Sequence, residues 1–139
     1  MQLEHSQQLL THAVQYALQI EVKVNIAVYD QGANLCAFQR MDNAPLGSIE
    51  IAQKKAYSAV MFGASTDNLG QLVKDQQLDG FAQTNGGLIL FAGGEPIYQA
   101  DQLIGGIGIS GGSAAQDKAI ALAAIKQSGY NRLGADDVA

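Results

Sequence analysis

The spacing of apolar residues predicts three long helices. Residues 3–20 place apolar side chains on one side of a helix and glutamines largely on the other. Residues 48–63 carry a narrow stripe of mostly small residues at three- and four-residue steps, and Gly63 stands where a helix C-terminus often places glycine. Residues 114–127 form an alanine-rich run with similar spacing. Because their side chains are small, these helices can pack close to a sheet or to another helix.

Alternating and continuous apolar runs predict five strands. The turn-forming sequence at residues 30–33 joins the first two strands into a hairpin, and Gly93-Gly94 has the composition of a two-residue hairpin turn. Strands that are joined by such short turns are antiparallel. The five predicted strands are residues 22–29, 35–40, 88–92, 95–99 and 103–110.

The order of these elements predicts an α+β fold in one domain over residues 1–139. A short helix, which begins at Ser65 or Thr66, precedes the last three strands. If the last strand lies beside the first, the sheet is mostly antiparallel, has the order 2-1-5-4-3 and is covered by helices. A length of 139 residues suits one domain, and an apolar share of 47% is enough to build its core.

Charge and hydropathy exclude several classes of protein. A net charge of −5 with 8 lysines and arginines argues against a nucleic-acid partner, because phosphate contacts need clustered cations. No stretch reaches the roughly 20 apolar residues that span a bilayer, so we expect no membrane partner. The first residues lack a basic segment that leads into an apolar run, and we therefore expect a cytoplasmic location.

A glycine-rich segment matches a nucleotide-binding pattern only in part. Residues 106–111 read G-x-G-x-x-G, and a predicted helix follows them. The dinucleotide fingerprint also needs an acidic residue on a second strand about 20 positions later, where this chain reaches Ser128 at its end. We interpret Gly106 and Gly108 instead as residues that clear one face of a strand for a closely packed helix.

Three blocks of sequence carry a family resemblance. They are residues 26–30 with 40–42, residues 48–63, and residues 105–117, and together they span nearly the whole chain. These blocks resemble the GlcG/HbpS family, which also forms the C-terminal domain of PduO-type proteins. The resemblance implies a profilin-like α+β fold over residues 1–139 and assembly into a homo-oligomer. It also implies a small anionic ligand or haem, because some members bind haem.

The two histidines lie seven residues apart on the first predicted helix. His5 and His12 therefore share a face, but the spacing is too long for one metal ion to be held by both. Haem iron accepts a histidine nitrogen, and His12, which lies inside the helix, is the better candidate for this metal ligand. The alternative is that both are partly exposed polar residues without a metal.

Four charged residues match positions of the family motif, and the resemblance therefore raises them as candidate cofactor-binding residues: Arg40, Glu50, Lys54 and Lys55. From the residues alone, Glu50 and Lys54 suit a helix surface pair, and Arg40 suits an ion pair with Asp42. Lys54 and Lys55 lie about 100° apart on a helix, so one can face solvent while the other reaches toward a pocket.

The segment before the last helix is a candidate for anion binding. Free N–H groups at a helix start attract an anion such as a haem propionate. The simpler interpretation is a capping box of Ser113 and Gln116, and Asp117 disfavours an anion unless it points elsewhere. The candidate residues are Ser110, Gly111, Gly112 and Ser113.

The sequence leaves two functions open. The first is an oligomeric binding protein of the GlcG/HbpS type that holds haem or a related tetrapyrrole, with His12 at the iron and basic groups at the propionates. The second is an enzyme or accessory protein that acts on a small hydroxy acid, diol or aldehyde in glycolate- or propanediol/glycerol-type metabolism, with Lys54 or Lys55 and Glu50. The chain lacks a P-loop, H-E-x-x-H and G-x-S-x-G, so we assign no catalytic residue.

Overall fold

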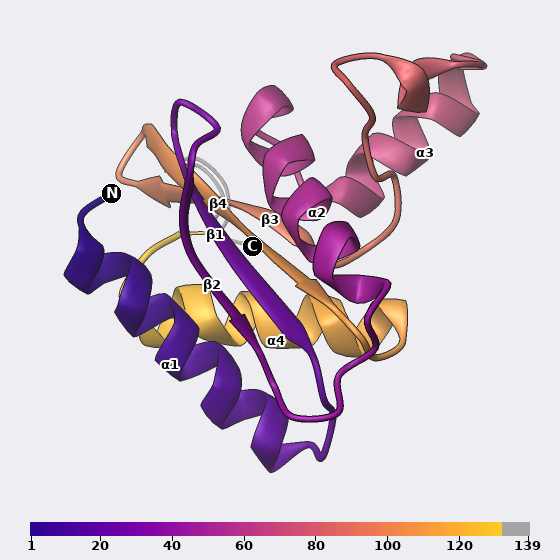
Figure 1. Ribbon diagram of the computed structural model, residues 1–139. Helices are drawn as coiled ribbons and strands as arrows, with labels where there is room; N and C mark the ends of the chain where they lie inside the picture. The colour runs from indigo at the N-terminus through magenta and orange to yellow at the C-terminus, as the bar shows by residue number, and fades with distance from the viewer. Residues whose placement is uncertain (132–139) are drawn as a thin grey trace.

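A computed structural model describes residues 1–131 of the chain (Figure 1). In this part of the chain, four α-helices and one short 3-10 helix accompany a four-stranded sheet. The elements are α1 (Leu3–Gln19), β1 (Asn25–Asp30), β2 (Leu35–Arg40), α2 (Ser48–Phe62), α3 (Thr66–Gln76), η1 (Phe81–Gln83), β3 (Gly94–Gln99), β4 (Gln102–Ser110) and α4 (Ala114–Gln127). The predicted α+β class is therefore confirmed.

The sheet has the order β2-β1-β4-β3, and each neighbouring pair of strands is antiparallel. The hairpin of β1 and β2 forms as predicted, with Asn25 opposite Arg40. The last strand lies beside the first, also as predicted, with Asn25 opposite Ser110. The antiparallel arrangement thus agrees with the sequence, but the number of strands does not.

The predicted strand at residues 88–92 is wrong, because its backbone bonds to helix side chains instead of to a neighbouring strand. The Ile89 N–H donates to Ser58 Oγ of α2 at 2.9 Å. Thr66 Oγ1 of α3 donates to the Phe91 carbonyl at 2.6 Å. The sheet of the described residues consequently has four strands and not the five of the order 2-1-5-4-3.

The predicted Gly93-Gly94 hairpin turn is also wrong, because these residues run into β3 and pair with β4. Gly94 is already the first residue of β3, and the Gly93 carbonyl accepts a hydrogen bond from Ile109 N at 2.9 Å. At the same end of the sheet, β1 begins at Asn25 and not at residue 22. Val22 N donates to Ala17 O at the end of α1, so residue 22 still belongs to the helix turn.

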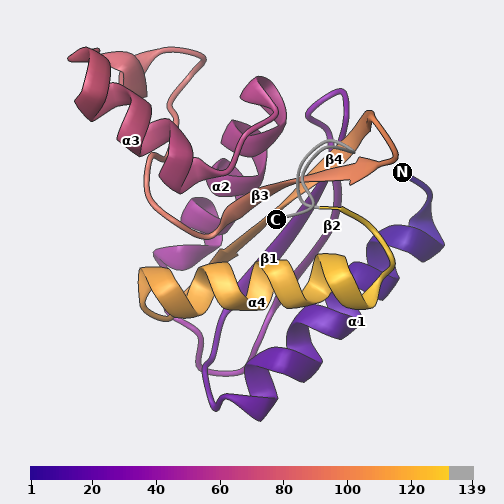
Figure 2. The same ribbon diagram turned by 180° about the vertical axis from the view of Figure 1, so that it is seen from behind.

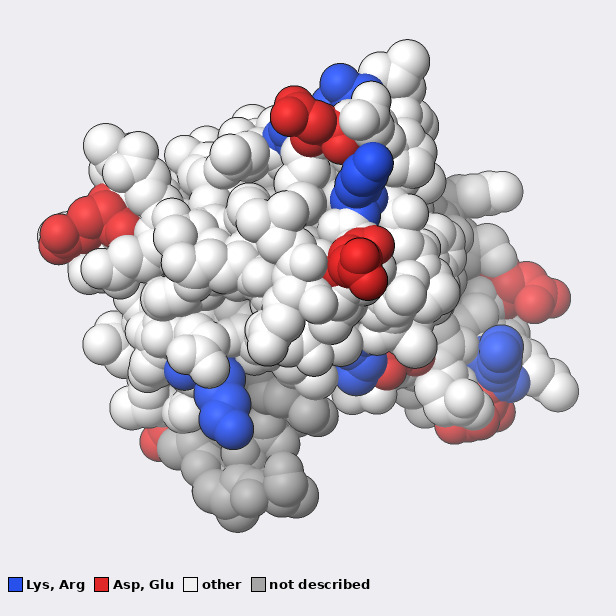
Figure 3. All heavy atoms as spheres, turned by 90° about the horizontal axis from the view of Figure 1, so that it is seen from below, with Lys and Arg blue, Asp and Glu red and all other residues white. Residues whose placement is uncertain are grey.

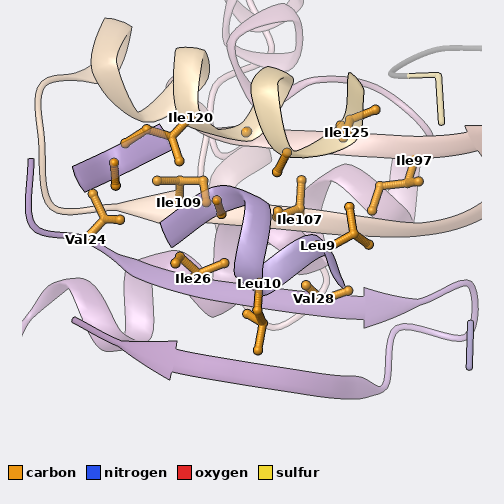
Figure 4. Packing of buried hydrophobic residues seen from close by; sticks show 14 of the residues in the cluster. Leu9, Leu10, Val24, Ile26, Val28, Ile97, Ile107, Ile109, Ile120 and Ile125 are labelled. Atoms are coloured by element: carbon orange, nitrogen blue, oxygen red, sulfur yellow. The ribbon is translucent and has the colours of Figure 1, made fainter. Parts of the chain in front are cut away.

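Helices cover the two faces of the sheet unequally. Figures 1 and 2 show α1 and α4 together on one face and α2 on the other, with α3 farther out. The main core lies between the sheet and the α1–α4 pair, where apolar side chains point toward one another (Figure 4). Burial of this surface is the dominant favourable term in folding. The members labelled in Figure 4 are Leu9, Leu10, Val24, Ile26, Val28, Ile97, Ile107, Ile109, Ile120 and Ile125.

The α2 helix lies very close to β4. A Cβ atom added to Gly106 would lie 2.7 Å from Val60 Cγ2, and one added to Gly108 would fall on the Ala52 carbonyl oxygen. Ala52 and Ala56 of α2 are fully buried on this side. The structure thus confirms that these two glycines clear a strand face for a helix.

The Asp30 carboxylate closes the β1–β2 hairpin, and its effect on stability should depend on pH. Oδ1 accepts hydrogen bonds from the Asn34 and Gly32 amides, each at 2.9 Å, and the Asn34 bond is the main reason that the pKa of Asp30 is lowered from 3.8. The stabilisation is therefore present above about pH 3.8 and is lost as the pH falls through the lowered pKa. We expect Asp30→Ala to lose about 1 kcal/mol at pH 7.

The measurement is urea denaturation of both proteins at pH 7 and in acid. The difference between the wild type and Asp30→Ala should shrink as the pH falls. An equal loss at both pH values would show that the carboxylate charge does not carry the effect.

Candidate functional site

Lys55 of α2 is buried, and its ammonium group is engaged inside the chain. Nζ donates to the Ile109 carbonyl at 2.8 Å and to Asp117 Oδ2 at 3.1 Å, and it lies 5.1 Å from the centre of the Phe91 ring. Burial lowers the pKa of Lys55, while the neighbouring Asp117 carboxylate opposes this shift. Lys55 therefore joins α2 to the start of α4 past the end of β4, and it does not reach into an open pocket.

The start of α4 forms the predicted capping box. Ser113 Oγ accepts from Gln116 N at 3.1 Å, and Gln116 Oε1 accepts from Ser113 N at 2.9 Å. Asp117 Oδ1 accepts from Gly112 N at 2.9 Å, so the carboxylate points into the turn. These bonds occupy the amides of Gly112, Ser113 and Gln116, and the geometry favours the capping interpretation over a ligand at Ser110–Ser113.

Glu50 and Lys54 line a hollow between α2 and Tyr29 of β1, which we call the α2 hollow. It has a volume of about 360 Å³. Lys54 Nζ donates to the Gly86 carbonyl at 3.0 Å and lies 5.1 Å from the centre of the Tyr57 ring. The expected pair with Glu50 is not among the salt bridges of the described residues. The lining residues are Tyr29, Ile49, Glu50, Gln53, Lys54 and Tyr57.

Arg40 lies at a different hollow, near the end of β2. Its Nε and Nη2 donate to the Ala44 carbonyl at 3.2 and 2.8 Å, so it fixes the loop before α2 and, within the described residues, does not form the expected ion pair with Asp42. This second hollow has a volume of about 320 Å³ and is also lined by Leu18 and Lys23. Arg40 is therefore not part of the α2 hollow.

His12 lies on the side of the sheet opposite the α2 hollow. Its Nδ1 is 2.8 Å from Ser128 Oγ at the end of α4, and the ring is half-buried. Because α1 and α4 cover one face and α2 the other (Figure 2), one chain does not bring His12 together with Glu50 and Lys54. The sequence-predicted residues therefore fall at separate places.

The structure adds polar residues that the sequence reasoning missed. Tyr57 lies three residues after Lys54 on α2, a spacing that places both side chains on one helix face and could have indicated it. Ser128 lies 116 residues from His12, and no local signal connects them. Glu95 of β3 is fully buried, and its Oε2 accepts from Lys118 Nζ at 2.8 Å.

The distribution of charged and metal-binding side chains, and the character of the helices, bear on which partners the chain can bind. On the face shown in Figure 3, basic and acidic residues are interspersed and form no continuous basic patch among the described residues. Among residues 1–131, no three His, Cys, Asp or Glu side chains gather as a metal site. No helix in that part of the chain is long and apolar enough to cross a membrane.

Comparison with known proteins places the chain in a family. The model of the family described as "Haem degrading protein HbpS-like" matches residues 1–126. The chain belongs to the HbpS-like family. This confirms the resemblance on which the sequence analysis rests, over nearly the whole of this HbpS-like chain.

Solved structures share the HbpS-like fold. The chain is similar to Klebsiella pneumoniae protein ORFY, with 35% identity, a TM-score of 0.88, and coverage of 92% of this chain and 90% of that one. It is also similar to the PduOC:heme complex, with 32% identity, a TM-score of 0.89, and coverage of 96% and 98%. The second of these structures is a complex with haem.

A curated relative is much longer than this HbpS-like chain. Corrinoid adenosyltransferase PduO of Salmonella typhimurium is 38% identical over 120 residues, which are 85% of this chain but 36% of that protein. An uncharacterized 15.0 kDa protein of Citrobacter freundii is 36% identical over 78% of each chain. The chain therefore corresponds to about a third of PduO's length.

Proposed function

We propose that this HbpS-like protein binds haem or a related tetrapyrrole. The observation that carries the proposal is the likeness to the PduOC:heme complex, at 32% identity over 96% of this chain. Within the chain, His12 offers the kind of nitrogen that haem iron accepts. The hydrogen bond that the His12 ring makes indicates whether this residue suits the role of an iron ligand.

The geometry at His12 fits an iron ligand. When Nδ1–H donates to Ser128 Oγ, which lies 2.8 Å away, the lone pair of the imidazole is on Nε2. Histidines that bind metals almost always donate their other ring N–H to such a partner, which fixes the tautomer and the ring orientation. Ser128 would thus present Nε2 of His12 toward the iron.

Self-association is part of the same proposal. Leu3 and Leu18 of α1 are 67% and 63% exposed, and apolar side chains of this size are commonly covered in an assembly. Lys54 and His12 lie on opposite faces of one chain, so the proposed haem site rests on His12 and does not include Lys54. Light scattering with and without haemin measures the oligomeric state.

One of the residues expected to serve the alternative enzymatic function, Lys55, is not available for it. Lys55 does not support a role in the chemistry of a hydroxy acid, diol or aldehyde, because its ammonium group is held by Asp117 and Ile109 in the interior. Glu50 and Lys54 remain together at the α2 hollow. With this pair alone, a binding role is the better supported of the two.

A haemin titration tests the role of His12. We expect the wild type to give a saturable Soret shift, and we expect His12→Ala to bind haemin at least about tenfold more weakly, because the iron loses its nitrogen ligand. His5→Ala is the matched control, since His5 lies on the same helix and has only Glu4 beside it among the described charged groups, at 3.8 Å. Its titration should match that of the wild type.

The Ser128→Ala variant separates ligation from orientation. It keeps the imidazole but removes its partner, and it should weaken haemin binding by about tenfold, the lower end of the effect of such partners. Haemin binding by His12→Ala with an unchanged spectrum and affinity would rule out His12 as the ligand. No saturable binding by the wild type would rule out the proposed function itself.

A further inference from the structure

The α2 hollow holds hydrogen-bonding groups that the described part of the chain leaves unused. The Glu50 carboxylate makes no hydrogen bond or ion pair with residues 1–131, and the Tyr29 hydroxyl makes no hydrogen bond there. Gln53 uses its Nε2 to donate to Ile49 O at 3.2 Å, and its Oε1 accepts no hydrogen bond from these residues. An acceptor carboxylate, an amide oxygen and a donor hydroxyl therefore face the same space.

The two charged residues of the hollow disfavour ligands that carry a net charge. A simple anion would meet the Glu50 carboxylate, and a simple cation would meet the Lys54 ammonium. A hydroxyl group both donates and accepts, so it can donate to Glu50 while it accepts from Tyr29 or Lys54. Ile49 supplies an apolar wall for the carbon atoms of such a ligand.

We propose that the α2 hollow binds a small, uncharged molecule with two or more hydroxyl groups. The volume of about 360 Å³ lies within the range for small-molecule sites, so the hollow has room for a molecule of this kind. The site lies across the sheet from His12 and is therefore independent of the proposed haem site. It is a second binding site of the protein.

The same hollow is coupled to the chain segment at residues 85–89. Lys54 Nζ donates to the Gly86 carbonyl at 3.0 Å, and the Tyr57 hydroxyl donates to the Asn85 carbonyl at 2.7 Å. Lys54 and Tyr57 also line the hollow. A ligand that accepts the hydroxyl hydrogen of Tyr57 competes with the Asn85 carbonyl, and a ligand that accepts from Lys54 shares the ammonium that holds Gly86, so we expect binding to change the surroundings of residues 85–89.

The test is an NMR titration of the full-length protein with glycerol. We expect saturable shifts of the backbone amides at Tyr29 and at residues 49–57, which extend to residues 85–89. Glu50→Ala and Tyr29→Phe should each weaken the binding at least tenfold, and a dispersed amide spectrum shows that each variant is folded. Asp42→Ala is the matched control, because it removes an acidic residue from the other hollow, and its affinity should equal that of the wild type.

Three results would overturn the proposal. The first is a set of shifts that grow linearly with glycerol and never saturate. The second is an unchanged affinity in Glu50→Ala. The third is saturation by acetate or methylammonium at concentrations below those needed for glycerol, which would give the hollow a charged ligand. A parallel titration of His12→Ala should match the wild type, so that failure of this site and failure of the haem site are distinguished.

Discussion

Lys55→Ala is expected to lower the free energy of unfolding by about 3–5 kcal/mol, the usual loss when one partner of a buried ion pair is removed. The Lys55 and Asp117 side chains are only 1% and 4% exposed, and their charged atoms are 3.1 Å apart. The variant would leave the Asp117 carboxylate in the interior without its cation. It would also remove the hydrogen bond to the Ile109 carbonyl. Guanidinium denaturation at pH 7 measures the loss.

The neighbouring lysine provides the control for Lys55. Lys54→Ala removes an ammonium group at the edge of an open hollow, and we expect a loss below about 1 kcal/mol. The double variant Lys55→Met with Asp117→Asn should recover part of the loss, because no charge is left buried and the new side-chain amide oxygen can still accept from Gly112. If Lys55→Ala and Lys54→Ala unfold at the same denaturant concentration, the buried pair does not stabilise the fold.

Features set by neighbouring residues were predicted well. The bounds of α4 agree with the prediction, and α2 ends at Phe62, followed by Gly63, whose φ of 59° is the left-handed conformation that glycine favours after a helix end. The capping box of Ser113 and Gln116 was also predicted. Each of these signals lies within a few residues of the structure that it specifies, so the sequence alone reveals it.

Features set by distant partners could not be predicted. The run at residues 88–92 has the composition of a strand, but Ser58 and Thr66 from two helices take its backbone groups. Lys54 and Lys55 are identical neighbours in the sequence, but Lys55 lies on the buried side of α2 and its carboxylate partner, Asp117, is 62 residues away. The candidate residues were therefore mostly on suitable elements, but their grouping into sites required the fold.

Gly108→Ala is expected to destabilise the protein by about 3 kcal/mol, the upper end of the usual cost of overpacking a core. The added methyl group would fall on the Ala52 carbonyl oxygen and would lie 2.6 Å from the Ala56 amide nitrogen. Both contacts are with the backbone of α2, which cannot move aside as a flexible side chain can. The helix must therefore shift away from the sheet, and thermal or urea unfolding measures the cost.

Gly47→Ala separates this steric cost from the general effect of replacing glycine. Gly47 has a φ of −61°, and a Cβ added there would meet no atom within 4 Å. Alanine at this position restricts the unfolded chain without strain in the folded one, so we expect a gain of about 0.5 kcal/mol. The two variants should therefore move the unfolding midpoint in opposite directions. If the unfolding midpoint of Gly108→Ala is at or above that of the wild type, the packing of α2 on β4 does not require a glycine at this position.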